Sequence, residues 1–158
     1  MNTGVALVAT LLNEERHLPR FLDAIIAQSR APQEIILVDG GSEDRSCEII
    51  RKYIEKGARI ELLVEKGANR SRGRNVGIKY SNQPLIAVTD ADCRPDKEWL
   101  DKLVAPLEKG EAEVAAGYYR ADALNTLARA VAAATVPAPE EVEADKFLPS
   151  SRSVAFRK

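Results

Sequence analysis

The chain has 158 residues, enough for one domain with a sizeable core, and 45% of them are hydrophobic, as in an ordinary globular protein. The formal net charge is only -1, so the strong basic excess typical of nucleic-acid-binding proteins is absent and we expect no nucleic-acid partner. Two cysteines, Cys47 and Cys93, are too few for a disulfide framework.

The N-terminus has no basic segment followed by an apolar one, as a signal peptide would have. No apolar run reaches the ~20 residues that are needed to cross a bilayer. We therefore predict a cytoplasmic protein with reduced thiols. Peripheral association with the cytoplasmic face of the membrane stays open.

Short apolar runs alternate with longer amphipathic stretches. Residues 5–12 are apolar and partly β-branched, as in a buried strand, and residues 15–28 carry apolar side chains at helical spacing, with Pro19 in the first turn. The same pattern continues with strand 34–38, helix 44–56 closed by Gly57, strand 60–64, helix 69–80, strand 84–89, helix 96–108 and strand 113–119. Further along we expect an alanine-rich helix at 124–135, an acidic loop at 137–145, and no clear pattern in 147–158.

This order of elements predicts an α/β fold, a three-layer α/β/α sandwich with a mostly parallel central sheet. In such sheets ligands bind at the carboxyl ends of the strands, near the point where strand order reverses. Polar and acidic residues follow three predicted strands: Asn13-Glu14-Glu15, residues 39–44 and Asp90-Ala91-Asp92. We therefore expect the functional site at this edge of the sheet.

Asp90 and Asp92 stand two positions apart just beyond a predicted buried strand. Two such carboxylates can share a hard divalent cation, and Mg²⁺ or Mn²⁺ keeps open positions for diphosphate oxygens. The alternative is a solvated acidic turn, which would be the better interpretation of an isolated Asp-x-Asp. The position after a buried strand favours the metal site.

Asp39 begins a turn that contains Gly40 and Gly41, which allow a ligand to approach the backbone closely. Asp39 would accept a hydrogen bond from a base or a ribose, and Ser42 could cap the following helix. The alternative is a plain strand-to-helix turn with a capping residue.

Basic residues gather around the third strand-to-helix connection, and arginine suits phosphate because its planar fork is bidentate. The cluster consists of Lys66, Arg70, Arg72 and Arg74. A solvated basic helix face is the alternative, which we expect for two of the four. His17 is interpreted as a surface residue and Trp99 as a core anchor.

These segments together resemble the family 2 glycosyltransferases, which have the GT-A fold, a Rossmann-like fold of nucleotide-diphospho-sugar transferases. The resemblance rests on Leu12-Asn13-Glu14-Glu15, residues 38–44, Gly73-Arg74-Asn75-Val76-Gly77, Asp90-Ala91-Asp92 and the closing residues 148–158. It implies transfer of a sugar, usually with inversion, from a UDP- or GDP-sugar to an acceptor hydroxyl of a glycan, lipid or small molecule.

The resemblance also implies site residues. The nucleotide-sugar would be bound by Leu12, Asn13, Glu14, Asp39, Gly40, Lys66, Arg70, Arg74, Asn75, Asp90 and Ala91. Asp92, with Asp90 beside it, would hold Mn²⁺ or Mg²⁺. Arg152 and Arg157 would lie on the acceptor side.

The chain departs from the family's pattern in two places. Gly40 stands where the family often has a second acidic residue that reads the base. No residue matches the motif of the acidic catalytic base, which usually follows the Ala155-Phe156-Arg157 segment. We therefore expect residues 1–158 to form a single, truncated domain, with a donor-binding core at 1–119, the start of an acceptor-side region at 120–158, and the base beyond Lys158.

Two other functions remain as alternatives. One is a non-catalytic nucleotide-sugar-binding domain, which the missing base motif favours. The other is a nucleotidyltransferase, which we would expect to have a glycine-rich basic loop where this chain has Asn13-Glu14-Glu15. A dinucleotide-binding oxidoreductase would need Gly-x-Gly-x-x-Gly after the first strand, and that motif is absent. A receiver-like signalling domain would not account for the closing segment.

Overall fold

A computed structural model describes residues 3–122, 125–136, 142–143 and 150–158, and in it the chain forms an α/β fold. Its strands are β1 (Val5–Leu11), β2 (Glu34–Asp39), β3 (Ile60–Val64), β4 (Leu85–Asp90), β5 (Val114–Ala116) and β6 (Val154–Arg157). Its helices are α1 (Leu18–Ile26), α2 (Ser46–Glu55), α3 (Arg70–Tyr80), α4 (Trp99–Glu108) and α5 (Thr126–Thr135).

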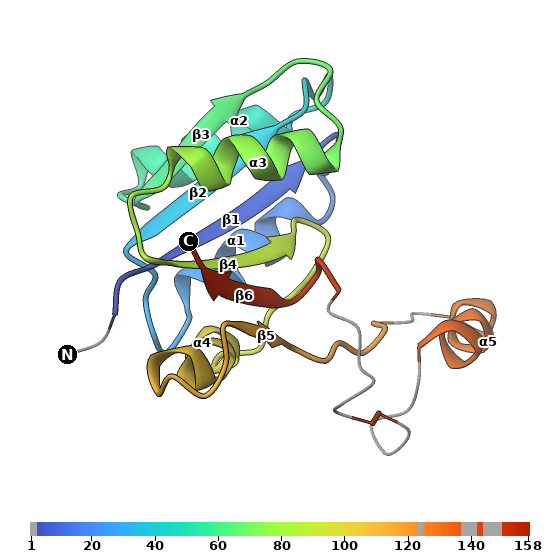
Figure 1. Ribbon diagram of the computed structural model, residues 1–158. Helices are drawn as coiled ribbons and strands as arrows, with labels where there is room; N and C mark the ends of the chain where they lie inside the picture. The colour runs from blue at the N-terminus through green and yellow to red at the C-terminus, as the bar shows by residue number, and fades with distance from the viewer. Residues whose placement is uncertain (1–2, 123–124, 137–141, 144–149) are drawn as a thin grey trace.

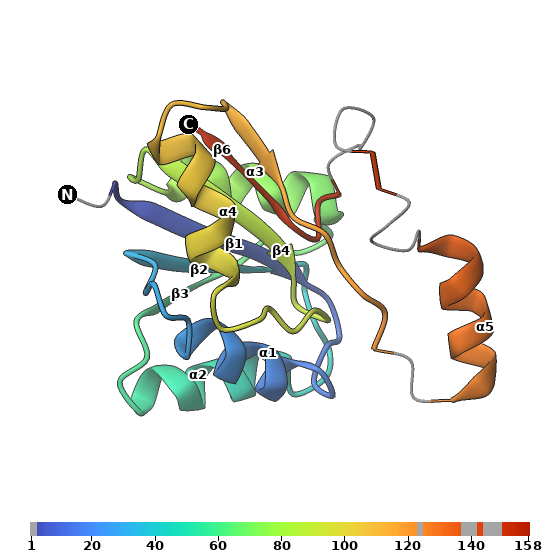
Figure 2. The ribbon, with the colours of Figure 1, turned by 90° about the horizontal axis from the view of Figure 1, so that it is seen from below.

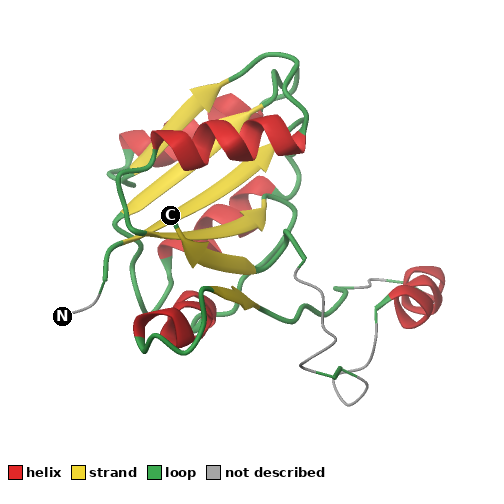
Figure 3. Ribbon diagram, viewed as in Figure 1, coloured by secondary structure: helices red, strands yellow, loops and turns green. Residues whose placement is uncertain are grey.

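The strands form one six-stranded sheet in the order β3-β2-β1-β4-β6-β5. β1 pairs in parallel with β2 and with β4, and β2 pairs in parallel with β3. β6 runs antiparallel between β4 and β5 (Figure 3). The chain therefore builds outward from β1 to β3 and then crosses to β4 on the other side of β1. This reversal opens a crevice at the carboxyl ends of β1, β2 and β4, where ligands bind in such sheets.

Helices cover both faces of the sheet: α3 lies on one face, and α1, α2 and α4 lie on the other (Figures 1 and 2). Alternate residues of β1 point to opposite faces. Leu7 belongs to the core cluster that contains Phe21 of α1, whereas Val8 belongs to the cluster against which Val76 of α3 packs. Because both faces are covered, β1 and β4 are buried along their whole length, and their polar residues, Thr10, Thr89 and Asp90, stand near their carboxyl ends.

Two glycines let α3 lie close to the sheet. A Cβ atom at Gly73 would lie 2.9 Å from Cγ2 of Thr10, and one at Gly77 would lie 2.6 Å from Cγ1 of Val8. Real Cβ atoms rarely approach so closely, so any side chain here would push the helix outward. The glycines thus bring the first turn of α3 against the ends of β1 and β2.

The predicted three-layer fold with a mostly parallel sheet is confirmed, and the structure contains each of the predicted strands and helices. β5 is shorter than the predicted 113–119. β6 is not predicted by the sequence, because its pairing partners in β4 and β5 lie far away along the chain. Leu124 of the predicted helix and most of the predicted loop 137–145 lie outside the described residues. Within the described part of the chain, no helix is both long enough and apolar enough to span a membrane.

Candidate functional site

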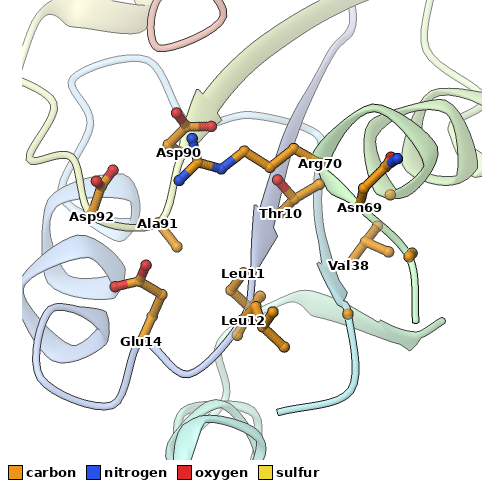
Figure 4. A pocket seen from close by; sticks show the side chains of 13 residues that line it. Thr10, Leu11, Leu12, Glu14, Val38, Asn69, Arg70, Asp90, Ala91 and Asp92 are labelled. Atoms are coloured by element: carbon orange, nitrogen blue, oxygen red, sulfur yellow. The ribbon is translucent and has the colours of Figure 1, made fainter. Parts of the chain in front are cut away.

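A pocket of about 210 Å³ lies in the crevice at the carboxyl edge of the sheet. Its walls come from the ends of β1, β2 and β4 and from the start of α3 (Figure 4). The predicted site residues that line it are Leu12, Glu14, Gly40, Arg70, Asp90, Ala91 and Asp92. The fold thus brings together three strand ends, at Leu11, Asp39 and Asp90, that lie far apart in the sequence.

Asp39 is buried, with 1% of its surface exposed, and does not line this pocket. Its carboxylate accepts hydrogen bonds from the backbone N–H groups of Gly41 and Ser42, both at 2.9 Å, and from the Ser42 hydroxyl. These bonds close the turn after β2. The position of Asp39 therefore favours a role in the shape of the loop over direct contact with a base.

Asn13 acts on the same loop from the end of β1. Its backbone adopts a positive φ of 57°, its N–H donates to Ser42 Oγ at 2.8 Å, and its Oδ1 accepts from the N–H of Glu43 at 2.9 Å. The expectation that Ser42 caps α2 is wrong, because its hydroxyl is engaged by Asp39 and Asn13. Asp44 instead accepts from the N–H of Ser46, at 2.9 Å.

The two carboxylates of Asp90-Ala91-Asp92 have different surroundings. The Asp90 side chain is only 7% exposed; it accepts a hydrogen bond from Nη2 of Arg74, and its Oδ2 lies 3.9 Å from Nε of Arg152. Asp92 is exposed, and its Oδ1 is 3.6 Å from the thiol of Cys93. Burial, followed by the negative charge of Asp92, raises the pKa of Cys93 to about 11, so this thiol is neutral at pH 7. Asp92 is therefore the more open carboxylate of the pair.

The fit of this pair to a divalent cation follows from these contacts. Among the residues that the structure describes, no group of three or more histidine, cysteine or acidic side chains could hold a metal ion. Mg²⁺, however, is commonly held by one or two carboxylates together with substrate phosphates and water. The site thus fits a cation that Asp92 binds together with a phosphorylated ligand, and it does not fit a cation that the protein encloses alone.

The basic cluster divides into two groups. Arg70, on the first turn of α3, extends across the pocket toward Asp90 (Figure 4), and Arg74 contacts the same carboxylate. Arg72 pairs with Glu65 on the surface. Lys66 and Asn75 are exposed and do not line the pocket. This division agrees with the expectation that only part of the cluster faces the site.

Thr10 lines the pocket although the sequence does not single it out. It is 9% exposed, and its hydroxyl is buried without a hydrogen-bond partner among the described residues. A buried hydroxyl without a partner is costly, and such groups commonly mark a place where a ligand or water binds. The available signal was a polar residue near the end of an otherwise apolar strand.

A second, larger hollow of about 1130 Å³ lies between α5 and the body of the domain. Asp92 is the one described residue that lines both pockets. Arg152 lines the second pocket, and its guanidinium lies 5.4 Å from the centre of the Tyr119 ring. Burial lowers the pKa of Arg152, but the hydrogen bond to Tyr119 and the charge of Asp92 outweigh this, so the net shift is upward.

Arg157 is at the opposite edge of the sheet. It pairs with Leu85 at the start of β4, donates to the carbonyl of Leu107, and has its Nε 3.6 Å from Oε2 of Glu113. The expectation of an acceptor-side position therefore does not agree with the structure for Arg157, because β6 runs antiparallel to β4 and carries this residue away from the crevice.

The sequence profile described as "Glycosyl transferase family 2" matches residues 7–150, which is most of the chain. The chain belongs to this family. It is also similar to undecaprenyl-phosphate 4-deoxy-4-formamido-L-arabinose transferase from Photorhabdus laumondii subsp. laumondii. The two are 32% identical over 139 residues, which cover 85% of this chain and 42% of that protein.

Solved glycosyltransferase structures share the fold. The mannosyltransferase PcManGT from Pyrobaculum calidifontis, in complex with GDP-Man and Mn²⁺, has a TM-score of 0.75 at 19% identity and covers 99% of this chain and 45% of its own. S. aureus TarS 1-349, in complex with UDP-GlcNAc, has a TM-score of 0.67 at 20% identity and covers 78% of this chain and 36% of its own. The chain spans less than half the length of the curated relatives it matches.

Proposed function

We propose that this chain binds a nucleoside-diphosphate sugar in the first pocket and presents the sugar to an acceptor hydroxyl in the second, for transfer with inversion. The observation that carries the proposal is the junction of the two pockets at Asp92. A diphosphate beside Asp92 would place the anomeric carbon at that junction. An acceptor in the second pocket could then approach from the side opposite the leaving diphosphate, as inversion requires.

The size of the first pocket supports a division of the donor into two parts. Its volume of about 210 Å³ is below the ~300–1,000 Å³ of pockets that enclose a drug-sized ligand. We propose that it takes the nucleoside, with Leu12 and Gly40 beside the base and with Thr10 and Glu14 as hydrogen-bonding groups. The diphosphate and the sugar would extend past Asp90 toward Asp92.

We propose that arginines of α3 bind the diphosphate. Arg70 already reaches into the pocket (Figure 4), and Arg74 is held close to the pocket by its ion pair with Asp90. Guanidinium groups form bidentate, charge-assisted hydrogen bonds with phosphate oxygens. In this arrangement Asp90 positions Arg74 near the diphosphate and does not itself bind the cation. Asp39 and Asn13 would contribute by fixing the loop after β2.

We propose that Asp92 binds Mn²⁺ or Mg²⁺ together with diphosphate oxygens. Such a cation, when bound, neutralises charge that develops on the leaving diphosphate. The complex of PcManGT with GDP-Man and Mn²⁺ supports a cation of this kind, and the complex of TarS with UDP-GlcNAc supports a nucleotide-sugar donor. We assign no residue of this chain as the base that deprotonates the acceptor.

Calorimetry with UDP and with GDP, each with and without Mn²⁺, tests the proposal. We expect one nucleotide to bind in an Mn²⁺-dependent manner, and Asp92→Asn to weaken that binding at least tenfold because it removes the charge that holds the cation. Glu111→Gln is a matched control, because it removes an exposed carboxylate from the turn after α4, at the other edge of the sheet. If neither nucleotide binds, or if Asp92→Asn binds like the wild type, the proposal is wrong.

A further inference from the structure

The second pocket has a composition that donor binding does not explain. Its walls come from two parts of the chain, the body of the domain and α5, which lies apart from the sheet in both ribbon views (Figures 1 and 2). The body contributes four arginines: Arg20, Arg94, Arg120 and Arg152. The helix contributes aliphatic side chains, including Leu127 and Val131. One pocket thus combines a cationic wall with an aliphatic one.

The arginines are not equally neutralised. Nη2 of Arg20 lies 2.8 Å from Oδ2 of Asp122, and Nη2 of Arg94 lies 3.7 Å from the same oxygen. Arg152 reaches Asp90 only at 3.9 Å. Arg120 is exposed and forms no ion pair with any residue in the described part of the chain.

Three carboxylates also line this pocket: Asp92, Asp96 and Asp122. Asp122 is engaged by Arg20 and Arg94, and Asp92 is the proposed cation ligand. Arg120 and Arg152 therefore remain as the groups that can bind an anion close to Asp92.

The aliphatic wall is open to solvent. Leu127 is 76% exposed and Val131 is 54% exposed, although both are large apolar residues. Their spacing of four residues places them on the same side of α5, and both line the pocket. Trp99 adds an aromatic surface to the pocket. Its indole N–H already donates to Oγ of Ser153 at 2.8 Å, so the ring offers the pocket apolar surface and no free donor. Exposed apolar residues that line a hollow are typical of a binding surface.

We propose that the second pocket binds a lipid phosphate as the acceptor, with the phosphate at Arg120 and Arg152 and the hydrocarbon chain along Leu127 and Val131. The attacking oxygen is then an oxygen of this phosphate, in place of an alcohol hydroxyl: it forms the bond to the anomeric carbon while the bond from that carbon to the nucleoside diphosphate breaks, and the nucleoside diphosphate leaves. The inference rests on the proposed function, since it names the class of acceptor for the same site. Guanidinium groups match phosphate oxygens in charge and geometry, and the aliphatic side chains match a hydrocarbon chain. A carbohydrate acceptor would use the polar side chains of the pocket and leave Leu127 and Val131 without a role.

Trp99 is the single tryptophan of the chain and lines this pocket, so its fluorescence reports on binding there. We expect titration of the whole chain with farnesyl phosphate to give a saturable change in fluorescence. Farnesol and inorganic phosphate, which each carry half of the recognised chemistry, should bind at least tenfold more weakly.

Variants separate the two walls. Arg120→Gln should weaken the binding of farnesyl phosphate about fivefold, and the double variant Leu127→Ser, Val131→Ser should weaken it about tenfold. Both variants should still bind the nucleotide with Mn²⁺. The matched controls are Arg59→Gln, an exposed arginine just before β3, and Val114→Ser, an exposed apolar residue at the start of β5. Both controls should bind farnesyl phosphate like the wild type.

The outcomes distinguish this inference from the proposed function. If farnesyl phosphate does not change the fluorescence of Trp99 in a preparation that binds the nucleotide, the proposal of a lipid-phosphate acceptor is wrong and the proposed function stands. Equal binding of farnesol and farnesyl phosphate would also overturn the inference, and so would binding of maltose in place of both. If nucleotide binding fails as well, the proposed function fails with it.

Discussion

Glu108, at the end of α4, joins three segments near the amino edge of the sheet. Its Oε2 accepts from Nη1 of Arg30 at 2.7 Å, and its Oε1 accepts from Nη2 of Arg30 at 2.8 Å and from the N–H of Thr3 at 2.7 Å. Arg30 also donates to the carbonyl of Thr3 at 2.8 Å. The Arg30 side chain is 6% exposed, so loss of the carboxylate would leave a buried guanidinium without its close counter-charge.

These contacts make the stability of the domain depend on pH. The hydrogen bond with Arg30 is the main reason that the pKa of Glu108 falls from 4.5 to about 2. Because the pKa is lower in the folded state, the carboxylate stabilises the fold fully above pH 4.5, and this contribution is lost as the pH falls toward 2. One pKa unit corresponds to ~1.4 kcal/mol, so the full contribution is about 3 kcal/mol.

Urea unfolding of wild type and Glu108→Gln at two pH values measures this contribution. The variant should be less stable by about 3 kcal/mol at pH 7 and by about 2 kcal/mol at pH 3.5, where part of the wild-type advantage has already been lost. Glu111→Gln, three residues further along and exposed, should change stability by less than ~0.5 kcal/mol. The reasoning would be refuted if wild type and Glu108→Gln differed in free energy of unfolding by the same amount at both pH values, or by less than ~0.5 kcal/mol at pH 7.

Three further predictions concern the site and its supports. Thr10→Val should raise the stability to urea by about 1 kcal/mol, because a buried hydroxyl without a partner is replaced by a methyl group, and should weaken nucleotide binding in calorimetry about tenfold; unchanged nucleotide affinity would remove Thr10 from the site. Gly77→Ala should lower the free energy of unfolding in urea by about 1–3 kcal/mol, because its Cβ would lie 2.6 Å from Cγ1 of Val8. The control Asn75→Ala, on the exposed side of the same helix, should leave the free energy of unfolding unchanged. Arg157→Gln should leave nucleotide and farnesyl phosphate binding unchanged, and a loss of either would restore its acceptor-side role.

The parallel part of the sheet could be predicted because each inner strand carries its own signal. β1, β2 and β4 are apolar on both faces, and each is followed by a polar segment and then by an amphipathic helix. Those local signals locate the carboxyl edge and hence the crevice. β6 has no comparable signal, since its four residues form a strand only in contact with β4 and β5. Pairing over such a distance is a property of the whole fold.

The roles within the site were harder to predict, because a sequence shows which groups are present and not which partners they have. Asp39, Asp90 and Asp92 look alike in the sequence. In the structure Asp39 is occupied by the N–H groups of its own turn, Asp90 is occupied by arginines, and Asp92 alone is exposed. Burial and hydrogen bonding thus separate three carboxylates that composition and spacing treat as equivalent.

The direction of β6 explains why one of the two closing arginines reaches the site and the other does not. Val154 pairs with Val88 near the end of β4, and Arg157 pairs with Leu85 at its start. The residues just before β6 therefore lie at the carboxyl edge, where Nε of Arg152 comes within 3.9 Å of Asp90. A parallel strand with the same sequence would have carried Arg157 to that edge instead. The antiparallel insertion between β4 and β5 is thus the feature that supplies the proposed acceptor pocket with its arginine next to Asp92.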